Sequence, residues 1–242
     1  MSERWLTAKV VENRHWTETL FSLRVEGAHL DFQAGQFVRI ALDIDGQRVA
    51  RAFSFVNPPQ DPTLEFYGVV VPEGPLSPRL AKLRAGDALY VAGNPAGFLV
   101  LNEVPDAETL WLVSTGTGLA PFLSILRTDA PWKRFKNIVV VHAVRHASEL
   151  AYRELIYATK ARYVSFVSRE TASGSLAGRI PAAIADGRLE KAAGVALKPE
   201  SSHVMLCGNP QMLKDAQAAL VARGMRKHRR RTPGQITVES FW

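Results

Sequence analysis

The sequence predicts two domains of different fold class: an N-terminal antiparallel β-barrel and a C-terminal α/β domain with a parallel sheet. Before about residue 102, short strand-like segments are separated by Gly- and Pro-containing turns, which is typical of a barrel. After it, apolar strands alternate with helical segments, which favours a parallel sheet. The chain has 242 residues, 47% of them hydrophobic, which is enough for two cores. We therefore assign residues 1–102 and 103–242 to the two domains.

The N-terminal part shows four strand-like segments, at 38–42, 51–56, 64–71 and 88–92. Turn residues follow or precede each of them, such as Asp45-Gly46 and Asn57-Pro58-Pro59. A short helix is expected over 77–83. Ser77 would be its N-cap and Pro78 would occupy its first position.

The C-terminal part shows apolar strands at 110–113, 138–144, 164–167 and 204–206. Helices are expected from the turn after residue 118 to about 126, over 149–160 and over 211–223. Parallel strands end at one edge of their sheet, and ligands of such sheets bind there. The residues that follow each strand are therefore the first candidates for a site.

The net charge of +7 is unevenly distributed. Residues 1–105 carry 10 basic and 12 acidic groups, a net of −2, whereas residues 106–242 carry 20 basic and 11 acidic groups, a net of +9. Six cations lie close together near the C-terminus: Arg223, Arg226, Lys227, Arg229, Arg230 and Arg231. The cluster holds no aromatic residue for base stacking, which argues against nucleic-acid binding. A docking surface for an acidic protein is favoured over a solvated helix end.

Cys207 is the single cysteine, which excludes an internal disulfide and a four-cysteine metal or iron–sulfur site within this chain. We expect no metal site. No apolar run reaches the roughly 20 residues of a membrane-spanning helix, and no secretory signal is visible. A cytoplasmic location without a membrane partner is therefore expected.

Three motifs carry chemistry. Gly116-Thr117-Gly118 follows a buried strand, where glycines let the backbone approach a phosphate, although an ordinary helix-capped turn fits equally well. Cys207-Gly208-Asn209-Pro210 lies at a second strand end. In Arg51-Ala52-Phe53-Ser54, alternation places Arg51 and Phe53 on one strand face and Ser54 on the other.

Together, and in this order, the motifs resemble the ferredoxin–NADP reductase superfamily of flavoproteins, with its R-x-[YF]-[ST], G-T-G-x-A-P and C-G-x-P signatures. The resemblance covers essentially the whole chain and is strongest to the bacterial ferredoxin (flavodoxin)–NADP reductases. Leu76-Ser77-Pro78, the segment 167–171 and Gly178-Arg179-Ile180-Pro181 support it.

The resemblance implies that the barrel binds FAD. Arg51 would pair with the FAD pyrophosphate, Phe53 would lie against the isoalloxazine ring and Ser54 would bond near N5. Further FAD contacts are implied for Tyr67, Gly68, Val69, Leu76, Ser77 and Thr115, and for Phe241 or Trp242 stacking from a C-terminal tail that returns to the flavin. Relatives often carry Tyr at positions 53 and 241, so any contact through that hydroxyl is lost here.

The resemblance also implies that the C-terminal domain binds NADP. Gly116, Thr117 and Gly118 would hold its pyrophosphate, and Cys207 would approach the nicotinamide. The 2′-phosphate would bind arginines, because guanidinium groups bond phosphate bidentately; the candidates are Arg145, Arg169 and Arg179. Ser54, Cys207 and Glu239 are the candidates near the hydride path.

The expected function is FAD-dependent electron transfer between NADPH and ferredoxin or flavodoxin, by hydride transfer to flavin N5 and release of single electrons. One alternative is a flavin reductase or an oxygenase reductase component of the same superfamily. The alternative from another class is a basic nucleic-acid-binding protein. The motifs fit either carrier, either direction of electron flow and any oligomeric state.

Overall fold

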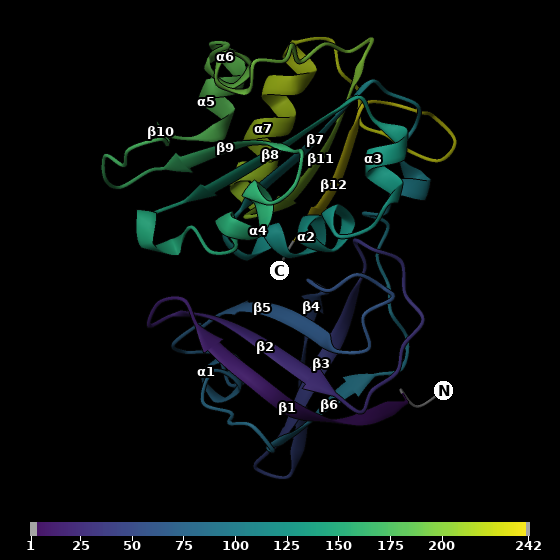
Figure 1. The fold of residues 1–242 in the computed structure, drawn as a ribbon, viewed down its shortest axis with the longest axis vertical. Coiled ribbons are helices and arrows are strands. Elements are labelled where there is room, and N and C mark those ends of the chain that lie inside the picture. The colour runs from purple at the N-terminus through teal and green to yellow at the C-terminus, as the bar shows by residue number, and fades with distance from the viewer. Residues whose placement is uncertain (1–3, 241–242) are drawn as a thin grey trace. The chain divides into compact units, whose positions relative to one another are not determined.

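The computed structural model describes residues 4–240 and divides the chain into two compact units (Figure 1). The first unit contains the residues up to Val100 together with Ala120–Thr128. The second contains Leu101–Leu119 and the chain from Asp129 onward. Each unit has a hydrophobic core of its own.

The first unit is built on a six-stranded antiparallel sheet in the order β4-β3-β6-β1-β2-β5. Its strands are β1 (Trp5–His15), β2 (Leu20–Glu26), β3 (Phe37–Ile44), β4 (Gln47–Ser54), β5 (Leu64–Val69) and β6 (Ala88–Ala92). The two edge strands meet just beyond β4, where Phe55 and Phe66 form an isolated bridge and the Val56 N–H donates to Glu65 O at 2.8 Å. The sheet therefore curls into a partly closed barrel, and the predicted fold class of this part is confirmed.

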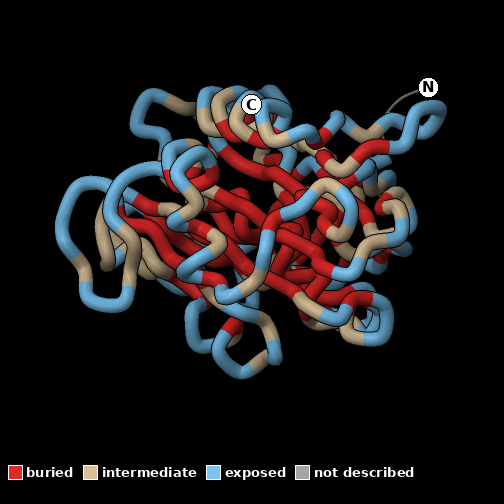
Figure 2. The backbone as a smooth tube through the Cα atoms, turned by 90° about the horizontal axis from the view of Figure 1, so that it is seen from above, coloured by how far each residue is buried: buried red, intermediate tan, exposed pale blue. Residues whose placement is uncertain are grey.

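The barrel interior is filled by side chains that alternate along the strands. Phe21, Leu23, Phe55 and Phe66 are almost completely buried there. Figure 2 shows the same contrast along the backbone, with buried strand segments in red and exposed loops in pale blue. Burial of such side chains contributes about 1.5–3 kcal/mol each.

The helix α1 spans Ser77–Leu80 only, so the predicted end at residue 83 is wrong. Leu76 and not Ser77 is the N-cap, and the Ser77 hydroxyl instead accepts a hydrogen bond from the Val71 N–H at 2.9 Å. The Asn13 side chain from β1 donates to the carbonyls of Leu80, Ala81 and Leu83. These bonds satisfy carbonyls that a longer helix would have used itself.

The second unit contains a six-stranded parallel sheet in the order β10-β9-β8-β7-β11-β12. The strands are β7 (Thr109–Thr115), β8 (Asn137–Val144), β9 (Arg162–Val167), β10 (Leu176–Ala177), β11 (Ser202–Gly208) and β12 (Ile236–Ser240). Helices α5 (Ile180–Ala185), α6 (Arg188–Ala193) and α7 (Pro210–Ala222) pack on one face of it (Figure 1). The parallel sheet confirms the predicted fold class.

The remaining helices are shorter. A 3₁₀ turn, η2 (Gly116–Leu119), follows β7 directly, and α2 (Ala120–Leu126) continues from it. After α3 (Ala130–Arg134), the 3₁₀ turn η3 (Ala147–Glu149) precedes α4 (Arg153–Tyr157). The single helix expected over 149–160 is therefore wrong. The remaining 3₁₀ turn, η1, covers Leu101–Glu103 and lies before β7 in the chain.

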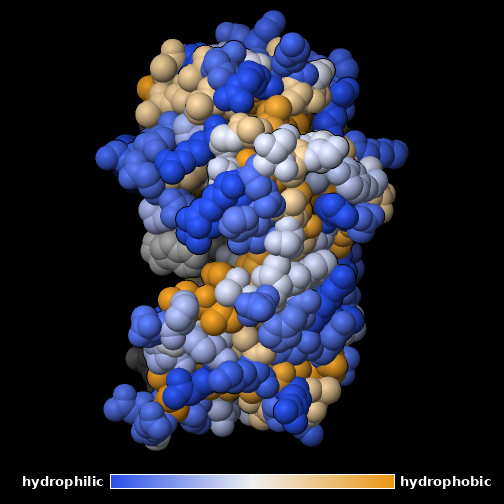
Figure 3. Space-filling view, turned by 90° about the vertical axis from the view of Figure 1, so that its left-hand side faces the viewer, coloured by the Kyte–Doolittle hydropathy of each residue, from blue (hydrophilic) through white to orange (hydrophobic). Residues whose placement is uncertain are grey.

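Between residues 4 and 240, no helix combines the length and the apolar character that crossing a bilayer requires. The face drawn in Figure 3 is mostly hydrophilic, with hydrophobic side chains in smaller areas between charged ones.

The buried His203 at the start of β11 predicts acid sensitivity of the fold. Its Nε2 lies 2.8 Å from Thr237 Oγ1, and burial, helped by the charges of His228 and Arg134, lowers its pKa from 6.5 to about 3. Between these values the unfolded chain binds a proton that the folded chain does not, so stability falls as the pH drops through this window. At pH 4.5 the loss from this group is about 3 kcal/mol.

His203→Gln removes that titration and keeps a side-chain donor for Thr237. Urea unfolding at pH 7.5 and 4.5 should therefore show an acid-induced loss that is about 3 kcal/mol smaller than in the parent protein. His29→Gln, at an exposed histidine of the barrel, is the control and should retain the parental loss. Equal acid-induced losses in the His203 variant and the parent would contradict the assignment.

Candidate functional site

The candidate nucleotide site lies where the strand order of the parallel sheet reverses. β7 pairs with β8 on one side and with β11 on the other, and the chain runs outward from β7 in both directions. Such a switch point leaves a crevice at the carboxyl ends of the two central strands, which is the usual ligand position in open α/β sheets. The two predicted turns, after β7 and after β11, lie at these ends.

The two turns interlock through their backbones. A Cβ at Gly118 would lie 2.6 Å from Cys207 O, and one at Gly208 would lie 2.3 Å from Thr115 Oγ1. The Asn209 N–H donates to the same Thr115 hydroxyl at 2.9 Å. The structure thus brings Thr115, Gly116, Thr117 and Gly118 beside Cys207, as the sequence predicted. The close approach leaves bare backbone at the strand ends, which suits a phosphate-containing ligand.

Cys207 is completely buried and lies opposite Glu239 in the β11–β12 register. Burial, followed by the negative charge of Glu239, raises the pKa of the Cys207 thiol well above its usual value. The thiol therefore stays protonated at neutral pH, and its environment is the opposite of that of a nucleophilic cysteine. A neutral sulfur can pack against a flat ring without reacting with it.

The three arginines predicted for the 2′-phosphate follow neighbouring strands. Arg145 follows β8 and Arg169 follows β9, and the Arg169 N–H donates to Arg145 O at 2.9 Å. Arg179 is the N-cap residue of α5. All three are exposed, and none forms an ion pair with a carboxylate between residues 4 and 240. The structure therefore provides unpaired cations for an anion near these strand ends.

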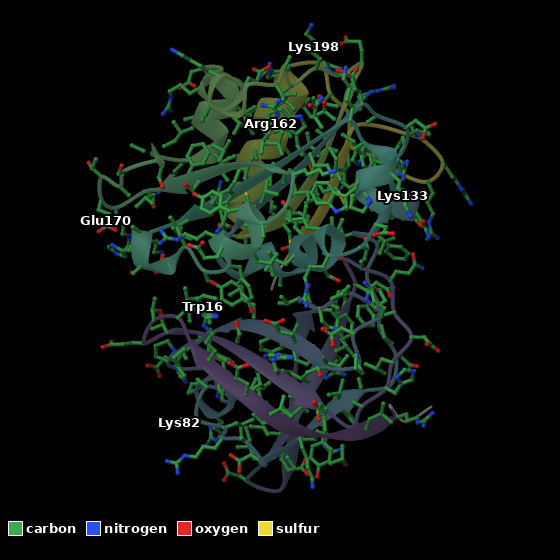
Figure 4. All side chains as sticks on the ribbon, viewed as in Figure 1. Trp16, Lys82, Lys133, Arg162, Glu170 and Lys198 are labelled. Atoms are coloured by element: carbon green, nitrogen blue, oxygen red, sulfur yellow. The ribbon has the colours of Figure 1, made fainter. Side chains whose placement is uncertain are left out.

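Two carboxylates close to these arginines are occupied by backbone groups. Glu149 Oε2 accepts from the N–H groups of Arg145 and His146, and Glu170 Oε1 accepts from the Ala147 N–H at 2.6 Å. That bond, together with His146, lowers the pKa of Glu170. Figure 4 shows Glu170 beyond the carboxyl end of β9, with Arg162 at the other end of the strand. The acidic groups thus shape the loop rather than neutralise the guanidinium groups.

The first unit contains most of the residues predicted to hold the flavin, whereas Thr115 belongs to the second unit. Ser54, at the end of β4, is buried, and its Oγ has no hydrogen-bond partner among the described residues. A Cβ at Gly68 on β5 would lie 3.1 Å from Phe53 Cε1, so the two positions are adjacent. The buried Ser54 hydroxyl without a partner suits a ligand with hydrogen-bonding nitrogens, and the Phe53 ring beside Gly68 offers an aromatic face to a flat ring.

The backbone near these residues offers further contacts. Tyr67, Gly68 and Val69 belong to β5, an edge strand whose one neighbour in the sheet is β2. In the described part of the chain, no protein acceptor takes the N–H of Leu76 or Ser77. Arg51 is exposed, and its Nη1 donates to Ala50 O at 2.7 Å. These groups fit the diphosphate and the ring edge of a dinucleotide.

The C-terminal cations do not form one uniform surface. Arg223 binds Glu190 at 2.6 Å and donates to the carbonyls of Ile184 and Leu197, so it belongs to the packing around α7 and not to a docking patch. Arg230 binds Glu103 through Nε and Nη2. Of the six C-terminal cations, those that are exposed and form no ion pair within the described chain are Arg226, Lys227, Arg229 and Arg231, which we call the C-terminal basic segment.

Two predicted contacts, Phe241 and Trp242, lie outside the described residues. Sequence reasoning also missed two residues of the nucleotide half. Asn209 caps α7 by accepting from the N–H groups of Gln211 and Met212 and also donates to Thr115. His142 lies in β8 with Nε2 3.1 Å from Gly116 O. The available signal for it was a single imidazole within an otherwise apolar strand.

Two family models match this chain. The family model of the oxidoreductase FAD-binding domain matches residues 5–99, and that of the oxidoreductase NAD-binding domain matches residues 112–218. The flavodoxin/ferredoxin–NADP reductases of Shigella flexneri and Escherichia coli (strain K12) are 54% and 53% identical over 245 residues, covering 98% of this chain and 99% of each relative.

A solved structure extends the likeness to the fold. The crystal structure of a ferredoxin NADP+ reductase from Neisseria gonorrhoeae with bound FAD and NADP covers 98% of this chain and 99% of its own, with a TM-score of 0.95 and 33% identity. These matches confirm the predicted oxidoreductase class and the two cofactors, FAD and NADP. The chain therefore belongs to the flavodoxin/ferredoxin–NADP reductase family.

Proposed function

We propose that this protein transfers electrons between NADPH and a ferredoxin or flavodoxin. The observation that carries the proposal is the interlocking of Gly118 with the carbonyl of Cys207 at the switch point, in a sheet whose strands β8 and β9 are followed by the unpaired Arg145 and Arg169. This arrangement combines a bare backbone cradle for a diphosphate with cations for an additional phosphate, which is what NADP has and NAD lacks. The names of the relatives supply the carrier class.

Each residue of the site has its own role in the proposed reaction. A bound FAD supplies the exchange between a two-electron hydride donor and one-electron carriers. Phe53 would pack on the ring and Ser54 would donate to it, while Cys207 would pack against the nicotinamide as a neutral thiol. Glu239 would stay close to that thiol. One NADPH becomes NADP+ with release of one proton, and its two electrons reduce two molecules of a one-electron carrier.

We further propose that residues 1–102 hold FAD and residues 103–242 hold NADP, with the tail residues Phe241 and Trp242 stacking on the flavin or its adenine. We also propose a cytoplasmic location, which is consistent with a single cysteine that is free and buried.

Steady-state assays of the FAD-loaded protein test the function. With NADPH as donor, we expect reduction of a purified ferredoxin or flavodoxin with kcat/KM well above that for free FMN or riboflavin. Similar efficiency with free flavins and no reduction of either carrier would show a flavin reductase instead. Protein that takes up no FAD would contradict the proposal altogether.

The C-terminal basic segment is proposed as the docking surface for the acidic carrier. Its four cations are exposed and lack acidic partners, so their field extends into solvent over a Debye length of about 8 Å at physiological salt. Fields of this kind mainly accelerate association. Arg223 and Arg230 are excluded from the surface because Glu190 and Glu103 neutralise them.

Replacing Arg229 and Arg231 with Ser should lower kcat/KM for the carrier by about tenfold at low salt and flatten its salt dependence. Reduction of ferricyanide by NADPH should be unchanged. The control is the double variant Lys160→Ser with Lys191→Ser, which removes the same charge from exposed positions outside the segment. Equal effects of the two double variants would refute docking at the segment and leave a net-charge effect.

A further inference from the structure

A row of buried polar side chains crosses the parallel sheet beneath the turn after β7. Cross-strand register places Ser165 of β9, His142 of β8, Ser114 of β7 and Cys207 of β11 side by side, and residues paired in this way share one face of a sheet. Ser114 Oγ donates to Val141 O, and Ser165 Oγ lies 2.7 Å from Ser175 Oγ. Both serines are therefore satisfied locally, whereas the imidazole of His142 reaches out of the row to the turn itself.

The contact of His142 fixes its tautomer. Nε2 lies 3.1 Å from Gly116 O, and a carbonyl oxygen accepts hydrogen bonds only, so Nε2 carries the proton. Nδ1 is buried without a partner in the described chain. A second proton there would have no acceptor in a side chain that is 0% exposed. Burial accordingly lowers the pKa of His142 to about 4, and the ring is a neutral donor at physiological pH.

The carbonyl that His142 contacts belongs to Gly116, the first residue of the turn after β7. Gly116 has φ +52° and begins η2, and a Cβ at this position would meet no atom within 4 Å, so nothing packs against it from that side. In a trans peptide the C=O and the following N–H point in opposite directions. A carbonyl held by His142 therefore turns the Thr117 N–H away from the imidazole, and first-turn N–H groups have no partner within their helix.

We propose that His142 is a positioning residue for NADP(H), which holds the Gly116–Thr117 peptide so that the Thr117 N–H is presented to the cofactor diphosphate. This inference rests on the proposed function, because it assumes that the Gly116–Gly118 turn receives NADP. His142 itself touches neither substrate nor cofactor. Its action is confined to the diphosphate, whereas Arg145, Arg169 and Arg179 act on the 2′-phosphate, and this separation makes the inference testable.

The experiment compares His142→Gln, His142→Asn and His142→Leu in the FAD-loaded protein, with NADP+ and adenosine 2′-monophosphate as ligands in calorimetric titrations. The Gln amide reaches the position of Nε2 and can donate to Gly116 O, whereas the shorter Asn reaches the position of Nδ1 and cannot. Asn and Leu should weaken NADP+ binding about tenfold, and Gln should stay within about threefold of the parent. Adenosine 2′-monophosphate lacks the diphosphate and should bind all four proteins equally.

Equal NADP+ affinity in all variants would overturn the inference. So would a parallel loss of affinity for both ligands, since general loosening of the domain does not distinguish them. If Leu does not fold, the Gln and Asn pair decides the comparison. Arg169→Ala separates this inference from the proposed function: if that variant binds NADP+ weakly while the His142 variants bind normally, the function stands and the inference is wrong. A parent protein that does not bind NADP+ refutes both.

Discussion

Gly118→Ala is expected to lower kcat/KM for NADPH by at least about 100-fold, on the measure that a displacement of about 1 Å in an active site costs this much. The new Cβ would lie 2.6 Å from Cys207 O and 2.8 Å from both Cys207 C and Gly208 Cα. All three are backbone atoms of a buried strand end and cannot swing aside like a side chain. The turn after β7 must therefore separate from the turn after β11, and the cradle opens.

Ferricyanide reduction by NADPH, measured beside the FAD content, checks this prediction. FAD should remain at one per chain, because most of the proposed flavin contacts, from Arg51 to Ser77, belong to the other unit. Gly187→Asn is the control: Gly187 has φ +79° and open space around it, and asparagine tolerates this conformation. A Gly118 variant with parental kcat/KM would show that NADPH does not depend on the interlocked turns.

The four central strands of the parallel sheet, β7, β8, β9 and β11, were predictable because burial on both faces leaves continuous apolar runs, whereas the edge strands β10 and β12 were not expected. The segment 138–144 is such a run, and β8 covers Asn137–Val144. The same reasoning did not predict β1. It is largely exposed, and its register shifts between Val10 and Glu12, so the inside–outside alternation of its side chains breaks in the middle of the strand.

Helix α4 was mispredicted for a tertiary reason. The residues 149–160 contain good helix formers, yet Tyr152 adopts φ +59° and the helix begins only at Arg153. The Glu149 side chain is engaged with the N–H groups of Arg145 and His146, which ties this segment to the strand end before it. This tertiary contact, which holds the loop that carries Arg145, overrode the local helix propensity.

The candidate site, like the fold, was predictable only in part. The glycine turns and the strand-end arginines follow from sequence position, because a parallel sheet assembles its strand ends whatever the loops contain. The partners of each side chain do not. Nothing in the order of residues indicates that Glu190 removes Arg223 from the basic surface, or that His142 reaches Gly116, since both contacts join elements far apart in the chain.

Arg169→Ala is expected to lower kcat/KM for NADPH between about tenfold and 100-fold while leaving that for NADH within about twofold, because a hydrogen bond to a charged group is worth about 1.5–3 kcal/mol. The two cofactors differ by the 2′-phosphate alone, so NADH is the control within each protein. Arg169 is exposed and forms no ion pair in the described chain, so its removal breaks no carboxylate contact of the fold. The loss should appear in KM, because an interaction remote from the reacting carbon binds ground state and transition state alike.

Arg169→Lys sharpens the assignment. Lysine keeps the charge but not the planar fork, so a bidentate contact predicts an intermediate loss and a purely electrostatic one predicts almost none. The salt dependence of KM for NADPH reports the charge alone, so it should flatten in Arg169→Ala and persist in Arg169→Lys. Equal losses for NADPH and NADH would remove Arg169 from the 2′-phosphate and leave Arg145 and Arg179 to select it. The backbone bond from Arg169 N–H to Arg145 O does not involve the replaced side chain, so the neighbouring guanidinium should keep its place in every variant of the series.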